Sequence, residues 1–204
     1  MLLLALGKSI SDIKFSDKLY AYVASKYGNA AHQQVKYWQS IIEQNRAATI
    51  EDKLFEVNRF FNKVNFVDDF SHWGQQDYWA TPIEFLGTYA GDCEDFAIAK
   101  YFTLVSMGVP KEKLRLMYVT ATRPVRQPHM VLAYYDKANS IPLVLDNINK
   151  QILPASKRRD LIPIYSFNGD GLWLAKSQGT GRKMRGKNNN SMWIELNSRM
   201  QQGY

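Results

Sequence analysis

Cys93 is the one cysteine of the sequence, and its position suits a nucleophile. It follows Gly91-Asp92 and opens the most apolar stretch of the chain, residues 93–107, which predicts a buried helix. The N-terminus of a helix carries partial positive charge and free backbone N–H groups, and both favour a thiolate over a thiol. Position alone is weak support, because a single buried cysteine is usually an inert small hydrophobe.

Two further residues, His129 and Asp146, flank a predicted hairpin whose turn is expected at 136–140. Because side chains alternate between faces, the two residues share a face only if paired positions sum to an odd number, as when 129 or 131 lies opposite 146. In that register Asp146 would orient the imidazole. His129 would then deprotonate Cys93 and later protonate the leaving amine.

Each of these residues has an ordinary alternative. His129 could end a strand without a chemical role, and Asp146 with Asn147 could simply close a strand in a turn. One catalytic explanation accounts for Cys93, His129 and Asp146 together, whereas the ordinary alternatives need a separate explanation for each residue. The residues therefore predict nucleophilic catalysis by a triad of Cys93, His129 and Asp146.

The elements that must position these residues divide the chain into a helical and a sheet-rich part. Apolar spacing predicts helices over 17–46, broken near Gly28-Asn29, and over about 51–64, with a short helix starting at Thr81-Pro82. Runs rich in β-branched and aromatic residues predict sequence-adjacent, antiparallel strands at 114–121, 129–135, 141–147, 161–166, 172–176 and 191–196. The sequence thus predicts an α+β fold with one domain over 1–204, helical from about 10 to 108 and sheet-rich from about 112 to 204.

Three carboxylates, Asp92, Glu94 and Asp95, surround the cysteine. Nearby negative charge raises the pKa of a thiol and weakens it as a nucleophile, so we expect something to neutralise them. A Ca²⁺ ion, which takes roughly six to eight oxygen ligands, would do so. The alternative is an N-cap at Asp92 followed by acids that the helix dipole favours, which needs no metal. The spacing is not that of an EF-hand loop, so the pattern itself leaves both interpretations open.

Three segments of the sequence resemble the bacterial transglutaminase-like cysteine proteinases and, within them, the LapG-type periplasmic proteases. They are, in order, Gly91-Asp92-Cys93-Glu94-Asp95-Phe96-Ala97, Pro128-His129-Met130-Val131-Leu132 and Leu145-Asp146-Asn147. The resemblance implies a papain-like, transglutaminase-type fold, with N-terminal helices and the nucleophile helix packed on an antiparallel sheet. It also implies a catalytic triad of Cys93, His129 and Asp146 and calcium ligands at Asp92, Glu94 and Asp95.

The same resemblance implies a calcium-dependent endopeptidase of the periplasm. Its substrate would be the N-terminal region of a large outer-membrane-associated adhesin, cut near a di-alanine site so that the adhesin is released and the biofilm disperses. A LapD-type inner-membrane receptor for cyclic-di-GMP would sequester the protease. Two alternatives stay open: a transglutaminase-type acyl transferase, which passes through the same thioester, and a non-catalytic binding module of the same fold.

Composition and charge bear on whether the protein has a core, spans a membrane, is secreted or binds nucleic acid. The 204 residues are 46% hydrophobic and 22% charged, which supplies enough apolar surface for a core. No stretch has the roughly 18 consecutive apolar residues of a membrane-spanning helix, and residues 1–6 lack the flanks of a complete signal peptide. The net charge is +7, and the basic excess lies in 150–204, mainly at 157–159 and 182–187. Without interleaved aromatic residues, these runs are more typical of a solvated loop than of a nucleic-acid site.

Overall fold

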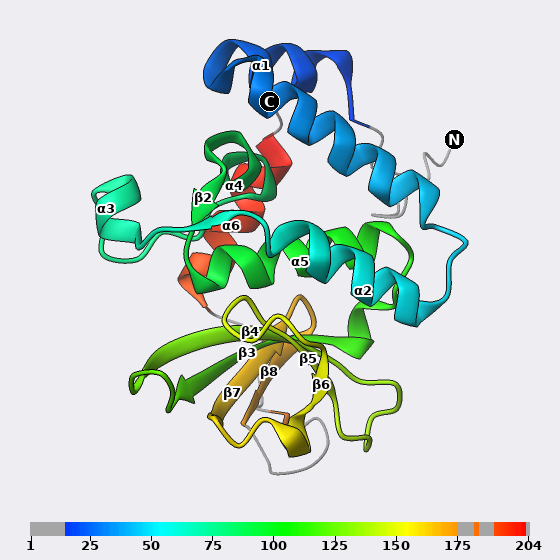
Figure 1. Ribbon diagram of the computed structural model, residues 1–204, viewed down its shortest axis with the longest axis vertical. Helices are drawn as coiled ribbons and strands as arrows, with labels where there is room; N and C mark the ends of the chain where they lie inside the picture. The colour runs from blue at the N-terminus through cyan, green and yellow to red at the C-terminus, as the bar shows by residue number, and fades with distance from the viewer. Residues whose placement is uncertain (1–14, 175–181, 184–189, 203–204) are drawn as a thin grey trace, which may run out of the picture.

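The computed structural model describes residues 15–174, 182–183 and 190–202. Its helices lie together on one side of the molecule and its main sheet lies on the other (Figure 1). Among the described residues, no helix is both long and apolar enough to cross a membrane. Most of the basic run at 182–187 and all of residues 1–6 lie outside the described part of the chain.

The helices begin at residues that cap them. They are α1 (Asp17–Gln44), α2 (Ile50–Phe61), α3 (Asp69–Trp73), α4 (Pro82–Thr88), α5 (Cys93–Ser106) and α6 (Ser191–Gln202). The N–H group of Leu19 donates to the Ser16 hydroxyl at 3.1 Å at the start of α1, and that helix bends at Gly28, where φ is 88°. The start of α4 carries a reciprocal pair of hydrogen bonds between Thr81 and Glu84. The predicted break at Gly28 and the predicted short helix after Thr81 are both confirmed.

The main sheet has its strands in the order β6-β5-β4-β3-β7-β8-β9, and every neighbouring pair is antiparallel. The strands are β3 (Leu114–Ala121), β4 (Gln127–Tyr134), β5 (Leu143–Leu145), β6 (Leu153–Pro154), β7 (Leu161–Asn168), β8 (Gly171–Leu174) and β9 (Arg182–Lys183). Two more short strands, β1 (Asn65–Phe66) and β2 (Ala90–Gly91), pair in parallel apart from this sheet. The predicted antiparallel sheet is confirmed, whereas α3, β1, β2, β6 and β9 were not predicted, and β9 lies in a run that was expected to be a loop.

Helix α5 is the centre of the fold because it is apolar on nearly every side. It packs against β4 and β3 below and against α2 and α4 beside it (Figure 1). Its interior residues, such as Ile98 and Leu104, are fully buried, and it ends just before Gly108, whose φ is 85°. The predicted α+β, transglutaminase-type arrangement, with the cysteine-bearing helix on an antiparallel sheet, is therefore confirmed.

The strand predicted at 191–196 is wrong, because this segment forms the first half of helix α6. Trp193 and Leu196 are buried and Met200 packs on the same core, which is a helical spacing rather than an alternating one. The Trp193 ring stacks on Phe102 of α5 with centroids 5.5 Å apart and an interplanar angle of 8°. Residues 191–196 are compatible with a strand locally, but packing against the core that includes Phe102 of α5 favours a helix.

Candidate active site

The pairing of β4 with β5 brings the predicted histidine and aspartate together. Leu132 lies opposite Leu145, so the numbers of paired residues add up to an odd number. Continuing the same pairing by one residue past the last hydrogen-bonded pair places position 131 opposite position 146. This is one of the two registers that the sequence required. His129 Nε2 lies 2.8 Å from Asp146 Oδ1, and the two side chains are almost completely buried, at 2% and 1% exposure.

The cysteine reaches the same region from the helical layer. Cys93 is the first residue of α5, and the backbone of Met130, the residue that follows His129, acts to lower the pKa of its thiol. The thiol donates to Glu94 Oε2 at 3.0 Å. Because His129 uses Nε2 toward Asp146, Nδ1 is the ring nitrogen left to exchange a proton with a thiol.

A buried arginine holds the other oxygen of the aspartate. Arg158, 3% exposed, places Nη2 at 2.6 Å from Asp146 Oδ2 and at 2.7 Å from Asp160 Oδ2. Its Nε also donates to Asp160 at 3.0 Å. The backbone N–H of Ile148 donates to Asp146 Oδ1 at 2.9 Å. The carboxylate of Asp146 is therefore fixed by two neighbours, Arg158 and Ile148, besides its contact with His129.

The helical layer supports Asp146 from above. Asn62, which ends α2, donates from Nδ2 to the backbone oxygen of Asp146 at 2.8 Å, and Lys100 of α5 donates from Nζ to Asn62 Oδ1 at 2.8 Å. Lys100 is 1% exposed, and burial lowers its pKa to about 7, although the charge of Asp146 opposes that shift. The loop that carries Asp146 is thus tied to both α2 and α5.

The acidic residues around Cys93 form one cluster with two further carboxylates. One ligand atom from each of Asp69, Asp92 and Asp95 lies within 4.8 Å of the others, and the same holds for Asp69, Asp77 and Glu94. The parallel pairing of β1 with β2 sets Phe66 opposite Gly91, which carries the start of α3 to the start of α5. We call these five residues the acidic cluster.

Burial and mutual repulsion dominate the electrostatics of the acidic cluster. Burial, reinforced by the charge of Glu94, raises the pKa of Asp92 to about 9, and burial raises the pKa of Glu94 to about 7. Burial also raises the pKa values of Asp69 and Asp95. Ionisation of Asp69, Asp92, Glu94 and Asp95 is therefore disfavoured when only the chain's own groups surround them.

The same groups disfavour the thiolate of Cys93. Burial raises the pKa of the thiol well above its ordinary value, and the charges of Glu94 and Asp92 raise it further. The backbone of Met130 opposes this shift and does not overcome it. The sequence-based expectation that the helix N-terminus favours a thiolate is therefore not met by the chain's own groups.

The acidic cluster has oxygens that a divalent cation could bind. Asp69 Oδ1 and Asp92 Oδ1 are both buried, and no described residue forms a hydrogen bond with either atom. Asp95 is engaged differently, because Oδ1 accepts from the N–H of Ala80 at 2.7 Å and Oδ2 from the N–H of Asp92 at 3.3 Å. Carboxylate oxygens are the donors that Ca²⁺ prefers, so the cluster fits that ion in donor type and in its unsatisfied charge.

Sequence reasoning missed the residues that reach the site from distant segments. Asp69 and Asp77 lie between the helix predicted over about 51–64 and the one predicted to start at Thr81-Pro82, and only the β1–β2 pairing places them at α5. Arg158 belongs to a basic run that reads as solvated, yet it is buried. An acidic residue two positions later, Asp160, is the one signal that could have suggested a paired arginine.

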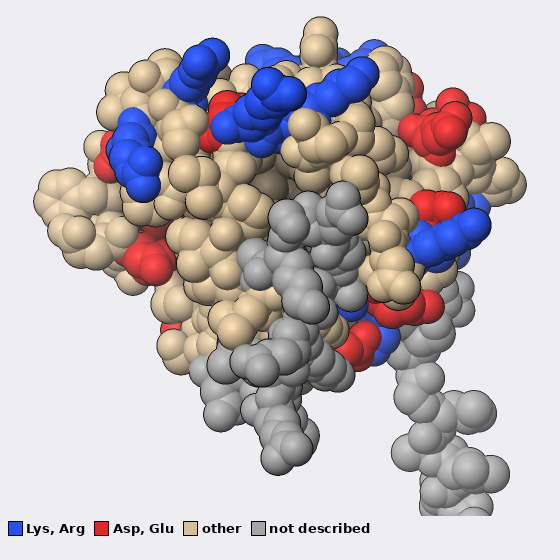
Figure 2. All heavy atoms as spheres, turned by 90° about the horizontal axis from the view of Figure 1, so that it is seen from below, with Lys and Arg blue, Asp and Glu red and all other residues tan. Residues whose placement is uncertain are grey.

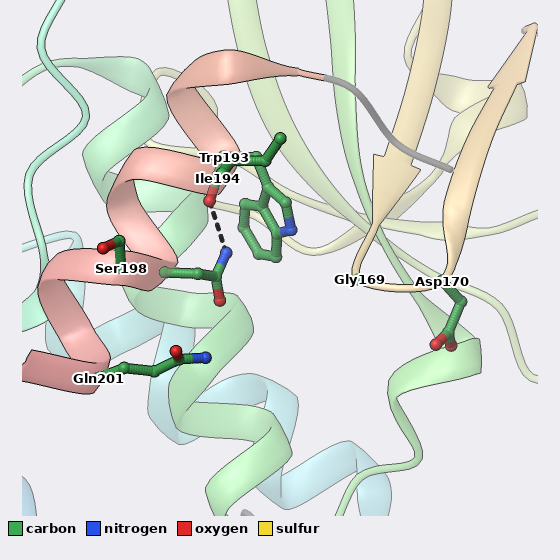
Figure 3. Close-up of a pocket in the computed structure, with 7 residues that line it drawn as sticks. Gly169, Asp170, Trp193, Ile194, Ser198 and Gln201 are labelled. Carbon is green, nitrogen blue, oxygen red and sulfur yellow. Dashed lines mark hydrogen bonds between the residues drawn. The ribbon is translucent and has the colours of Figure 1, made fainter. Parts of the chain in front are cut away.

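A second hollow lies away from this site, between α6 and the turn that joins β7 to β8 (Figure 3). Trp193 and Asn197 line it, and Asn197 Nδ2 donates to the backbone oxygen of Trp193 at 2.6 Å. Its one carboxylate, Asp170, is paired with Lys111 at 2.7 Å. Among the described residues, its lining includes no cysteine, no histidine and no lysine.

A cysteine at the start of a central helix, set against a strand that carries a histidine bonded to an aspartate, defines the transglutaminase-type class of cysteine enzymes. The sequence matches the family described as bacterial transglutaminase-like cysteine proteinase over residues 16–175. This chain belongs to that family. It is thus a member of a cysteine peptidase family.

Solved structures agree with this assignment. EGTA-treated LapG from Legionella pneumophila is 39% identical, with a TM-score of 0.79 over 90% of this chain and 96% of that chain. The calcium-bound form of Legionella pneumophila LapG is also 39% identical, with a TM-score of 0.78 over 91% of this chain and 99% of that chain. No curated protein matches the sequence.

Proposed function

We propose that this protein is a calcium-dependent cysteine endopeptidase in which Cys93 is the nucleophile, His129 the general base and acid, and Asp146 the residue that orients the imidazole. The observation that carries the proposal is the 2.8 Å hydrogen bond between His129 and Asp146, with His129 on β4, the strand against which the Cys93-bearing helix α5 packs. Family membership supports the same chemistry.

The reaction follows from these positions. His129 Nδ1 takes the proton of the Cys93 thiol as sulfur attacks the peptide carbonyl, and the backbone N–H of Cys93 stabilises the oxyanion. When the tetrahedral intermediate collapses, His129 gives that proton to the leaving amine, and a thioester forms. His129 then deprotonates a water molecule that attacks the thioester, and the acid leaves as the proton returns to the thiolate. Asp146 stabilises the imidazolium in both stages.

The calcium dependence belongs to the acidic cluster. Asp92, Glu94 and Asp95 would hold the ion, and Asp69 and Asp77 would join them. When bound, Ca²⁺ supplies positive charge that lowers the pKa values of these carboxylates and of the neighbouring thiol. Support comes from the unpartnered oxygens of Asp69 and Asp92 and from the likeness to a LapG structure solved with calcium.

We further propose the substrate, the location and the control of the enzyme. The substrate is the N-terminal region of a large surface adhesin, cut near a di-alanine site, so that cleavage releases the adhesin and promotes biofilm dispersal. The enzyme acts in the periplasm and is sequestered there by a LapD-type receptor when cyclic-di-GMP is abundant. These proposals are supported by the similarity to LapG over most of the chain.

The test is cleavage of a purified adhesin N-terminal region with calcium present, followed by mass spectrometry of both fragments. We expect a single cut near paired alanines, which is lost in Cys93→Ala and His129→Ala and strongly reduced in Asp146→Asn. Replacing the paired alanines of the substrate serves as the control. Cleavage retained in Cys93→Ala would remove the mechanism, and transfer to an added amine instead of water would make the enzyme an acyl transferase.

A further inference from the structure

A basic hollow of about 900 Å³ lies beside the loop that carries Asp146. It is formed by the β3–β4 turn together with two segments that follow β5, and its lining residues are Thr122, Arg123, Pro124, Ile148, Lys157, Arg159 and Asp160. Figure 2 views the molecule from the sheet side, and Lys and Arg side chains gather along the upper part of that face. We call this site the basic hollow.

The charge of the basic hollow is uncompensated. Arg123, Lys157 and Arg159 are exposed, and within the described part of the chain none of their side chains has an ion pair or hydrogen bond. Among the described lining residues the one carboxylate is Asp160, which is already bound by Arg158 through two nitrogens. Three cations therefore face a common space in which the described part of the chain places no free anion.

The walls of the basic hollow are the same groups that fix the catalytic pair. Ile148 donates its N–H to Asp146, while its side chain is 40% exposed. Asp160 holds Arg158 in place against Asp146. The β3–β4 turn joins this frame through Thr122, whose N–H and hydroxyl both donate to the backbone oxygen of Asp160, at 2.8 and 3.1 Å. The hollow is therefore preformed and shares a rigid frame with His129 and Asp146.

We propose that the basic hollow binds an acidic segment of the polypeptide substrate, away from the bond that is cut. Side-chain carboxylates would pair with Arg123, Lys157 and Arg159, and an apolar residue of the same segment would contact Ile148. The lining residues that the structure describes offer no aromatic ring on which a nucleic-acid base could stack, which favours a polypeptide ligand. The proposal rests on the proposed endopeptidase function, because it adds a specificity site to that substrate.

Binding is measured first and without turnover. The protein is Cys93→Ala with calcium present, and the probe is a fluorescein-labelled hexaglutamate peptide followed by anisotropy, with hexaglutamine as the neutral probe. Reversing two charges with Arg123→Glu and Arg159→Glu should weaken hexaglutamate binding by about ten-fold or more. The control pair, Lys18→Glu with Lys137→Glu, removes the same net charge at exposed positions outside the hollow.

The two charge-reversed pairs distinguish binding at the basic hollow from attraction by the net charge of the protein. Equal weakening in both charge-reversed pairs would mean that the net charge of the protein attracts the peptide, and it would overturn the proposal. Hexaglutamine binding as well as hexaglutamate would overturn it too. In a cleavage assay with the adhesin region, the hollow variants should raise KM by a larger factor than they change kcat. If no substrate is cleaved, the proposed endopeptidase function fails. The hexaglutamate measurement still shows whether the basic hollow binds acidic peptides.

Discussion

Arg158 and Asp146 form a buried ion pair, with 2.6 Å between Nη2 and Oδ2, on the side of the carboxylate that His129 does not use. Burial by itself raises the pKa of Asp146, but hydrogen bonds from His129 and Arg158 lower it by more, so the carboxylate stays ionised. Both oxygens are engaged, which prevents the carboxylate from turning away from the imidazole. Arg158 is thereby a positioning residue for His129, although it does not touch the ring.

The first prediction concerns this ion pair. Arg158→Met should lower the free energy of unfolding by about 3 kcal/mol, because it leaves the carboxylate of Asp146 buried with one partner fewer. It should also lower kcat more than it changes KM, since Asp146 could then rotate. Urea denaturation and steady-state cleavage measure the two effects. Arg126→Met, at an exposed arginine of the β3–β4 turn, is the matched control for stability.

Arg158→Lys distinguishes positioning from simple packing. A lysine keeps the charge and loses the fork that spans Asp146 and Asp160, so it should restore part of the stability and little of kcat. Full recovery of kcat by Arg158→Lys would contradict a geometric role for the guanidinium.

The second prediction concerns the reactivity of Cys93 toward iodoacetamide. With a chelator, the thiol should react slowly at neutral pH, because burial and the charges of Glu94 and Asp92 raise its pKa. With calcium, we expect the midpoint of the rate-against-pH profile to move down by about one unit or more. His129→Ala should slow the reaction in calcium. Asp92→Asn should weaken the response to calcium, and Asp136→Asn, at an exposed acid, should leave it unchanged.

A thiol that titrates identically with calcium and with chelator would separate the acidic cluster from the nucleophile. A thiol that also ignores His129→Ala would identify Cys93 as a structural residue and would favour a binding module of the same fold.

The third prediction concerns stability against pH. The folded-state pKa of Asp92 is raised to about 9, whereas an unfolded aspartate titrates near about 4, so the folded chain binds the extra proton between these values. Stability in a chelator should therefore fall as pH rises through this window. Glu94, raised to about 7, contributes in the same direction. We expect Tm to drop by several degrees between about pH 5 and about pH 9.

Calcium should flatten that decline, because binding keeps the folded carboxylates ionised and releases their protons. Scanning calorimetry of wild type and Asp92→Asn, each with calcium and with chelator, measures the effect. The Asp92→Asn variant should show a shallower decline in chelator. A Tm that rises with pH in chelator would show that the acidic cluster is ionised without a cation.

The fourth prediction concerns Gly91, which lies against the start of α5. A Cβ atom at this position would overlap Asp95 Oδ2 and approach Phe85 Cδ2 to 2.7 Å. Gly91→Ala should lower the free energy of unfolding by about 1–3 kcal/mol and reduce calcium affinity, because Asp95 must move. Gly169→Ala is the control, since nothing lies within 4 Å of its Cβ position. Equal stability of the two variants in denaturant titration would contradict the close packing at Gly91.

Local chemistry sufficed to predict much of this fold. The apolar run after Cys93 forms the helix that was predicted. Because its surface is apolar on nearly every side, the helix must lie at the centre of the fold, where that surface is buried. The strand at 114–121 agrees residue for residue, since its β-branched and aromatic residues suit a pleated, buried ladder. The strand predicted at 191–196 was wrong, because Trp193 and Leu196 fit a strand or a helix locally. Their packing into the core beside α5 favours the helix.

The sequence by itself determined the helix that opens at Cys93 and the hairpin between His129 and Asp146, because each depends on periodicity within a short stretch. The odd register that aligns the two side chains was a requirement, which the pairing of β4 with β5 meets. Only the tertiary structure decided which distant groups complete the site. Asp69 and Asp77 join Asp92 through the pairing of β1 with β2, and Arg158 reaches Asp146 from beyond β6. Such contacts depend on the relative placement of elements, and that placement is set by core packing and not by local propensity.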